Sequence, residues 1–373
     1  MKLNPMGFSF VSVLFLVFLA CSSGGLRNRT AAPATVNHAS SWQVQGIEAL
    51  YNGDYTSARK YLIEAYKQQQ KDPRTLFYLG LTFELLDKDM LAFQIYSRFV
   101  NLPAGEYFRQ LMRGRYHWMA ARILENQYRK AATKPVNTYW EFVPGHVVVL
   151  PFYIQTDAEA WNGIGRALTQ VMTRDLEQIS RLRVTADLEQ QALFRALSLS
   201  ENIPVNRAVV EKVQNAIGGG RVVVGSIAFR NGAEVQLRAA VIHPQTESLE
   251  FVTRSGDITR FFQLQKQLVL ELLKEMDIRL TVQEREALHF YPTASIEALR
   301  LFGLGLSAED VGDYAAAEGY YQQAIAVDAG FSTARNRLEY VRIMKLVSTP
   351  APELLHQLPA QKISAAVELQ PEG

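Results

Sequence analysis

The histidines of this chain, the residues most often used for metal binding and proton transfer, are scattered along the sequence. They occupy positions 38, 117, 146, 243, 289 and 356, and none belongs to an HExxH or HxH pair. Zinc sites place histidine ligands at such short spacings. The sequence therefore predicts neither a metal site nor a cofactor.

The run Gly218-Gly219-Gly220 is the segment closest in composition to a phosphate-binding loop. It leads into an apolar run beginning at Arg221 and opens no helix, so its N–H groups are poorly placed to cradle a phosphate. A tight turn between a helix and a strand is the better interpretation. No GxxxxGK[ST] run and no GxSxG elbow with a plausible triad is present. We expect a protein that is not an enzyme.

Cys21 is the single cysteine, which excludes an intramolecular disulfide. It follows an apolar run, Phe8 to Ala20, that is too short to span a bilayer but fits the core of a signal peptide. The Ala20-Cys21 junction and the Ser/Gly residues after it resemble a bacterial lipoprotein signal. In that class the cysteine becomes the lipidated first residue of the mature chain. The alternative is an ordinary cleaved signal with an incidental cysteine.

The lipoprotein resemblance implies a location. Residues 1–20 would be the signal peptide and residues 21–40, rich in Ser, Gly, Ala and Thr, a flexible tether. Ser22 in place of Asp implies sorting to the outer membrane, with the protein facing the periplasm. The formal net charge of +2 gives no reason to expect nucleic acid as a partner.

Two helix pairs follow the tether. Trp42, Gly46, the turn Gly53-Asp54-Tyr55, Ala58 and Ala65 have the spacing of a tetratricopeptide repeat. A second copy carries Leu79-Gly80, Ala92 and Tyr96, and the segment 105–131 is expected to complete the stack as a long cap. Such repeats need about three units to bury their faces. The pattern predicts repeat helices over 41–134.

The middle of the chain, 144–280, has the pattern of a mixed sheet packed with helices. HVVVLPFYI (146–154) predicts a buried strand, and LRVTA (182–186) a second strand parallel to it after an amphipathic helix from Trp161. Residues 221–257 predict an antiparallel three-strand meander with a tight turn at Asn231-Gly232. Leu237 and Val241 should face the core, opposite Arg238. Short helices are expected near 188–199 and 207–217, and another over 261–276.

The C-terminal part repeats the opening pattern. Leu304-Gly305 and Gly312-Asp313-Tyr314 again have tetratricopeptide spacing, and a helix over 332–346 would cap the repeat. We expect helices of this type over 281–346. The segment STPAPELLHQLPAQ and the polar residues after it predict a disordered tail over 347–373.

The α/β segment resembles the family that includes the curli-secretion lipoprotein CsgG and the N-terminal domain of TolB. The matching stretches are VVVLPF (147–152), TRDLEQISRLRV (173–184) and RVVVGSI (221–227). The residues around Thr185-Ala186-Asp187 depart from the pattern of that family, where an arginine is expected. The resemblance implies a fold of the class α/β plus all-α, in which a mixed-sheet domain is flanked by tetratricopeptide hairpins.

Three functions remain open. The first is a lipid-anchored scaffold or assembly factor of the cell envelope that binds protein partners and is not an enzyme. By analogy with other tetratricopeptide grooves, its binding residues would be Gln43, Arg74, Phe77 and Glu84, although packing inside the protein is an equal alternative. The other two are a curli-type secretion component or pore subunit and an enzyme that modifies envelope polymers. The apolar residues of 187–220 have helical spacing, which argues against a membrane-embedded strand pair. The oligomeric state is open.

Overall fold

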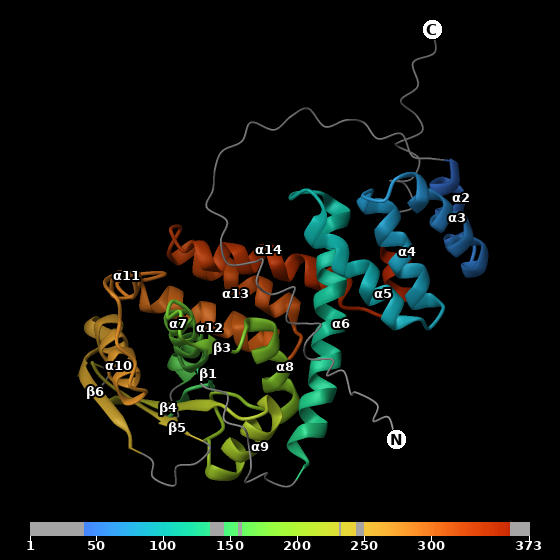
Figure 1. Cartoon of the computed structure of the whole chain (residues 1–373). Helices are drawn as coiled ribbons and strands as arrows, with labels where there is room; N and C mark the ends of the chain where they lie inside the picture. The colour runs from blue at the N-terminus through green and yellow to red at the C-terminus, as the bar shows by residue number, and fades with distance from the viewer. Residues whose placement is uncertain (1–40, 135–144, 156–158, 231–232, 244–249, 359–373) are drawn as a thin grey trace, which may run out of the picture. The chain divides into compact units, whose positions relative to one another are not determined.

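The computed structural model describes residues 41–134, 145–155, 159–230, 233–243 and 250–358 (Figure 1). The predicted signal peptide, tether and Cys21 lie outside these residues, as does the turn at Asn231-Gly232. Among the described residues, no helix combines the length and the apolar character needed to cross a membrane.

The N-terminal part consists of helical hairpins, as the repeat spacing predicted. Helices α2 (Ser41–Tyr51) and α3 (Tyr55–Gln68) form the first, and α4 (Pro73–Leu85) and α5 (Asp89–Tyr96) the second. The 3-10 helix η1 (Ser97–Asn101) continues α5. The predicted cap is α6 (Tyr107–Ala132), whose first half packs against α4, α5 and η1.

The central part is a mixed sheet with the strand order β3-β1-β4-β5-β6. Strand β1 (His146–Val149) runs parallel to β3 (Arg183–Val184) and to β4 (Arg221–Arg230), whereas β4, β5 (Glu234–Ile242) and β6 (Val252–Asp257) are antiparallel. The meander and the parallel second strand are therefore confirmed, although the second strand is shorter than predicted.

The strand predicted over 146–154 is broken in two, which corrects the sequence interpretation. Strand β2 (Tyr153–Ile154) pairs with β4 separately from β1. Pro151 has no N–H to donate between them. The N–H of Phe152 bonds to Thr169 Oγ1 at 3.1 Å instead of to the sheet. The Phe152 ring lies over Gly225 of β4, where a Cβ would be 2.2 Å from the ring.

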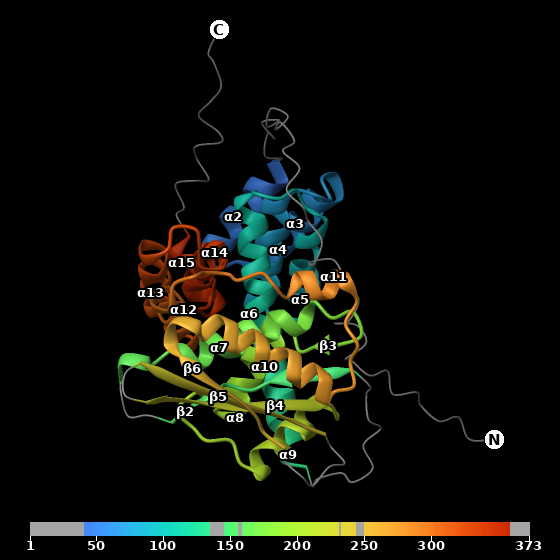
Figure 2. The same cartoon turned by 90° about the vertical axis from the view of Figure 1, so that its left-hand side faces the viewer.

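Helices cover both faces of this sheet (Figure 2). Leu237 and Val223 pack in one core with residues of α7 (Ile164–Glu177) and α10 (Phe261–Glu275). On the other face Val224 and Ala240 pack with residues of α8 (Asp187–Leu197) and α9 (Arg207–Ile217). Leu237 is fully buried, so the predicted register of β5 is confirmed. Val241 is partly buried on the same face.

The C-terminal part is helical. A short helix α11 (Val282–Ala287) precedes α12 (Ile296–Asp310), α13 (Tyr314–Val327) and α14 (Ser332–Val347). The two helices predicted for a repeat, and the helix predicted to cap them, are therefore present. Helix α12 packs against α7 and α8 of the central part, and α14 packs against α6.

The prediction of a disordered tail from 347 onward is wrong for its first residues. Val347 closes α14, and α15 (Ala351–Gln357) follows after three residues. Ala351, Leu354, Leu355 and Leu358 are buried, at the i, i+3, i+4, i+7 spacing of one helix face. The prolines and polar residues of this segment concealed that pattern. Residues 359–373 lie outside the described part.

Helix α6 joins the parts. Beyond the repeats it packs against α14 and then against α8 and α9 beside the sheet (Figure 1). Gly114 allows the crossing with α14, since a Cβ there would lie 2.7 Å from Val347 Cγ2 and 2.8 Å from Ile343 Cγ2. The first repeats and the C-terminal helices are thereby fixed against one another.

Candidate protein-binding site

The helices of each hairpin cross at a glycine. A Cβ at Gly80 would lie 2.5 Å from Cε1 of Tyr96, and one at Gly305 would lie 2.4 Å from Cε1 of Tyr321. At Gly46 the neighbour is Leu62, whose Cγ would be 2.6 Å away. Carbon atoms at such distances clash, so these positions accept no side chain. The same close approach recurs in the N-terminal hairpins and in α12–α13.

The turns of the first hairpin, α2–α3, and of the C-terminal hairpin, α12–α13, are also alike. Gly53 and Gly312 have φ of 78° and 82°, a left-handed conformation that favours glycine. The next residue caps the second helix: Asp54 accepts from Ser57 N at 3.0 Å, and Asp313 accepts from Ala316 N at 2.9 Å. These contacts fix the angle between the paired helices.

A buried carboxylate links each of two hairpins to the following helix. Tyr96 donates to Glu84 at 2.7 Å, and Glu84 is also paired with Arg115 of α6. In the C-terminal part, Tyr321 donates to Glu309, which Arg337 of α14 approaches at 3.4 Å. Burial raises the pKa of both tyrosines, so their hydroxyls stay protonated and donate.

Arg115 extends this link to the C-terminal end of the described chain. Its Nη1 donates to the carbonyl oxygens of Val347 at 2.5 Å and Thr349 at 2.6 Å. These residues lie at the end of α14 and in the connection to α15. The ion pair inside the repeat stack therefore also fixes the point where α15 begins.

Helix α15 lies against the first helices of the repeats. It packs on α4, and the hydroxyl of Tyr51, at the end of α2, donates to the Leu358 carbonyl at 3.2 Å. Leu354, Leu355 and Leu358 are 0%, 5% and 4% exposed. In Figure 1 the red C-terminal segment reaches the blue α4. The face formed by the first helices thus holds an amphipathic helix.

Aromatic and basic side chains lie near Tyr51, whose hydroxyl contacts the end of α15. The Arg74 guanidinium lies 5.9 Å from the centroid of the Phe108 ring, and its Nε is buried without a hydrogen-bond partner among the described residues. Burial raises the pKa of Tyr51 and of Tyr78, so both remain neutral donors. Tyr107, at the start of α6, is 39% exposed. This cluster gives the face both apolar surface and hydrogen-bonding capacity.

The four residues predicted to bind a partner have different surroundings. Gln43 is buried and donates to Thr75 Oγ1 at 2.7 Å, Phe77 is fully buried, and Glu84 belongs to the ion pair with Arg115. These three hold the hairpins together in the structure. Arg74 lies in the cluster near Tyr51, and a binding role for any of the four stays a prediction.

The residues that sequence reasoning missed are Tyr51, Tyr107 and the buried face of α15. The spacing of Leu354, Leu355 and Leu358 was the available signal. It spans only two turns of helix and is flanked by prolines, which favoured the interpretation as a tail.

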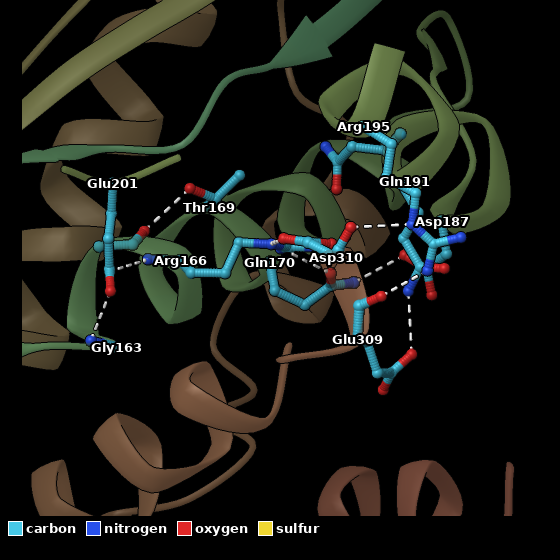
Figure 3. A network of polar contacts seen from close by, with 12 residues as sticks. Gly163, Arg166, Thr169, Gln170, Asp187, Gln191, Arg195, Glu201, Glu309 and Asp310 are labelled. Atoms are coloured by element: carbon cyan, nitrogen blue, oxygen red, sulfur yellow. Dashed lines mark hydrogen bonds and ion pairs between the residues drawn. The ribbon is translucent and has the colours of Figure 1, made fainter. Parts of the chain in front are cut away.

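A second candidate is a polar network where α12 meets the central part (Figure 3). Arg166, which is 2% exposed, pairs with both carboxylate oxygens of Asp310, at 2.6 and 3.3 Å. Arg195 donates to the Asp310 carbonyl at 2.8 Å and to the Glu309 carbonyl, which caps the C-terminal end of α12. A forked arginine–carboxylate pair of this kind is both strong and directional.

The same network caps the start of α7. Glu201 accepts from Gly163 N at 2.6 Å and from Arg166 N at 2.8 Å (Figure 3). A pocket of about 540 Å³ opens beside these groups, lined in part by Ser198, Ser200 and Ser307. Because the arginines already bind acceptors of the protein, the network serves to fix α12 on the central part.

Within the described residues, no group of three or more His, Cys, Asp or Glu side chains is arranged to hold a metal ion. The face of the repeats that holds α15 is the candidate protein-binding site.

Comparison with known proteins agrees with that choice. Residues 44–106 match the model of the tetratricopeptide repeat family. The match covers α3, α4, α5 and most of α2, whereas α12 and α13 repeat the same geometry outside it. No match was found among curated proteins or among solved structures.

Proposed function

We propose that this chain is a lipid-anchored scaffold of the bacterial cell envelope that binds a protein partner through its N-terminal repeats and is not an enzyme. The tetratricopeptide match over 44–106 supports the binding role, because such repeats generally act by holding protein segments. The lipoprotein-like junction Ala20-Cys21 motivates the anchor, with the protein on the periplasmic side of the outer membrane.

The observation that carries the proposal is the α15 contact. The face lined by α2 and α4 holds a helix through buried leucines and the Tyr51 hydroxyl. A helix laid into an apolar groove by residues at i, i+3, i+4 and i+7 is a common mode of protein recognition. The repeats therefore have a surface suited to that mode.

The central domain would serve as the platform of the scaffold. The Arg166–Asp310 pair and the Arg195 cap fix α12 on it, and α6 packs against both the repeats and α8. A partner held by the repeats would thus be held at a fixed place relative to the sheet. The resemblance to the CsgG and TolB family motivates an envelope role for this domain.

Site-specific crosslinking in intact cells tests the binding face. A photo-crosslinking amino acid at Tyr107, which is exposed and lies near Tyr51, should yield a defined adduct with a partner protein. Lys60, exposed on α3, provides the matched control position. No adduct at position 107 above the level found at position 60 would contradict the proposed face.

A further inference from the structure

The attachment of α15 differs from that of the other repeat helices. It has seven residues, whereas an isolated helix needs about 12–15 residues even to be marginally stable in water. Its helical form therefore depends on the surface beneath it. Ala351, Leu354, Leu355 and Leu358 supply that contact, while Glu353, His356 and Gln357 are exposed.

The connection to α14 lets α15 detach without disturbing the repeats. Arg115 binds the carbonyl oxygens of Val347 and Thr349, which precede α15. Within the described residues, the Tyr51 hydroxyl joins the segment 351–358 to the repeats by donating a hydrogen bond to the Leu358 carbonyl oxygen. Loss of this bond and of four apolar contacts would uncover the face, while the Arg115 anchor stays in place.

We propose that α15 is an internal occupant of the partner-binding face of α2 and α4, and that the partner displaces it with a helix of the same apolar pattern. This inference rests on the proposed function and names the class of partner. The partner segment would carry apolar residues, leucine above all, at i, i+3, i+4 and i+7. It would place them where Ala351, Leu354, Leu355 and Leu358 now lie.

The tethered helix lowers the apparent affinity with which a partner binds the repeats. A ligand that binds only the open form has its apparent affinity reduced by the fraction of molecules that are open. Changes that weaken α15 but leave α2, α4 and α6 intact should therefore strengthen binding in trans. A mutation in an ordinary binding interface would instead weaken binding.

The test uses purified full-length protein and a labelled synthetic peptide with the sequence of residues 348–358. The double variant Leu354→Asp, Leu355→Asp disrupts the buried face of α15. The double variant Glu353→Gln, His356→Gln changes its exposed face and is the control. We expect the first variant to bind the peptide at least about tenfold more tightly than the wild type, and the control to match the wild type.

A second variant provides the same test in case the first variant does not fold. A chain ending at Thr349 lacks α15 but keeps both carbonyl acceptors of Arg115, and it should bind the peptide as the first variant does. Folded variants that bind the peptide no more tightly than the wild type would overturn the proposal.

If neither variant folds, hydrogen exchange of the wild type decides. The amides of 351–358 must exchange faster than those of α4, and equal rates would mean that α15 does not open separately.

Two other results separate the alternatives. Dimers formed by exchange of α15 between copies would overturn the partner helix in favour of a second copy of this chain. Because the peptide measurement needs no cellular partner, it is independent of the crosslinking at Tyr107. Peptide binding without a crosslinked partner would count against the scaffold function alone.

Discussion

The crossing points of the hairpins leave no room for a side chain at Gly80 and Gly305, because the rings of Tyr96 and Tyr321 fill the space. Gly319 in α13 is a natural contrast, as a Cβ there would meet nothing within 4 Å. The three positions separate the effect of packing from the general effect of glycine in a helix.

Replacing Gly80 by alanine should therefore destabilise the protein. Overpacking of this kind costs about 1–3 kcal/mol of unfolding free energy. Gly319→Ala should instead stabilise it by about 0.5–1 kcal/mol, since alanine has the higher helix propensity. Denaturant unfolding of the two variants checks this, and a stabilising Gly80→Ala would show that the crossing is looser than described.

Arg115→Leu should cost more than a typical surface change. It leaves Glu84 buried without a counter-charge, and removing one partner of a buried pair typically costs about 3–5 kcal/mol. Adding Glu84→Leu should recover part of the loss, because the uncompensated charge is then gone. Chemical denaturation of both variants measures the coupling. A single variant within about 1 kcal/mol of the wild type would contradict a structural role for the pair.

The buried His146 side chain should make the folded protein less stable at acidic pH. Burial, together with the charge of Arg183, lowers its pKa to about 4, against about 6.5 for an exposed histidine. Between these values the unfolded chain takes up a proton that the folded chain excludes. The stability present above about pH 6.5 is thus lost as the pH falls toward 4, by about 3 kcal/mol. Unfolding of His146→Gln at pH 7 and pH 4.5 should show a smaller difference than the wild type, and an equal one would contradict this.

At the scale of elements, strand β5 is the clearest test of register. Leu237 is fully buried between the sheet and α10, so Leu237→Ala should cost about 2–5 kcal/mol. Arg238 lies on the opposite face, where its guanidinium is 4.8 Å from the Phe251 ring, and Arg238→Ala should cost less than about 1 kcal/mol. Thermal or denaturant unfolding compares them. A larger loss from Arg238→Ala would mean a shift of one residue in the strand.

Local patterns predicted most elements. The alternation in 221–257 and the repeat spacings at Gly46, Gly80 and Gly305 depend on neighbours in sequence, and each produced the expected structure. The break at Pro151 was not predicted, because it also depends on Phe152 meeting Thr169 and Gly225.

The site could be predicted less well. Gln43, Phe77 and Glu84 have the right repeat positions, but their partners, such as Arg115, come from other helices. Helix α15 was missed because its order depends on the surface of α4, far away in the sequence. Contacts between residues so far apart in the sequence cannot be predicted from local composition.

At the scale of the whole molecule, the described residues belong to one compact unit. The N-terminal repeats, central sheet and C-terminal helices share α6, the crossing at Gly114 and the Arg166–Asp310 pair. A partner bound at the repeats would therefore be held by the entire unit.

The proposed anchor predicts how this unit is located in the cell. Cys21→Ala removes the thiol that would carry lipid, so the variant should appear in the soluble periplasmic fraction or remain unprocessed. Fractionation and mass spectrometry of the N-terminus measure both. Wild-type protein that is soluble and has an unmodified cysteine would contradict the anchor.

The partner-binding role is tested most directly by quantitative crosslinking from intact cells, followed by mass spectrometry. Wild-type protein should be compared with Leu354→Asp, Leu355→Asp, which changes the buried residues of α15 and should uncover the face beneath it, and with Glu353→Gln, His356→Gln, which changes only exposed residues. We expect one partner to be recovered several-fold more with the first variant and unchanged with the second. No specific partner from any of the three proteins would contradict a scaffold that binds through its repeats. The same partner in equal amounts from all three would contradict only its displacement of α15.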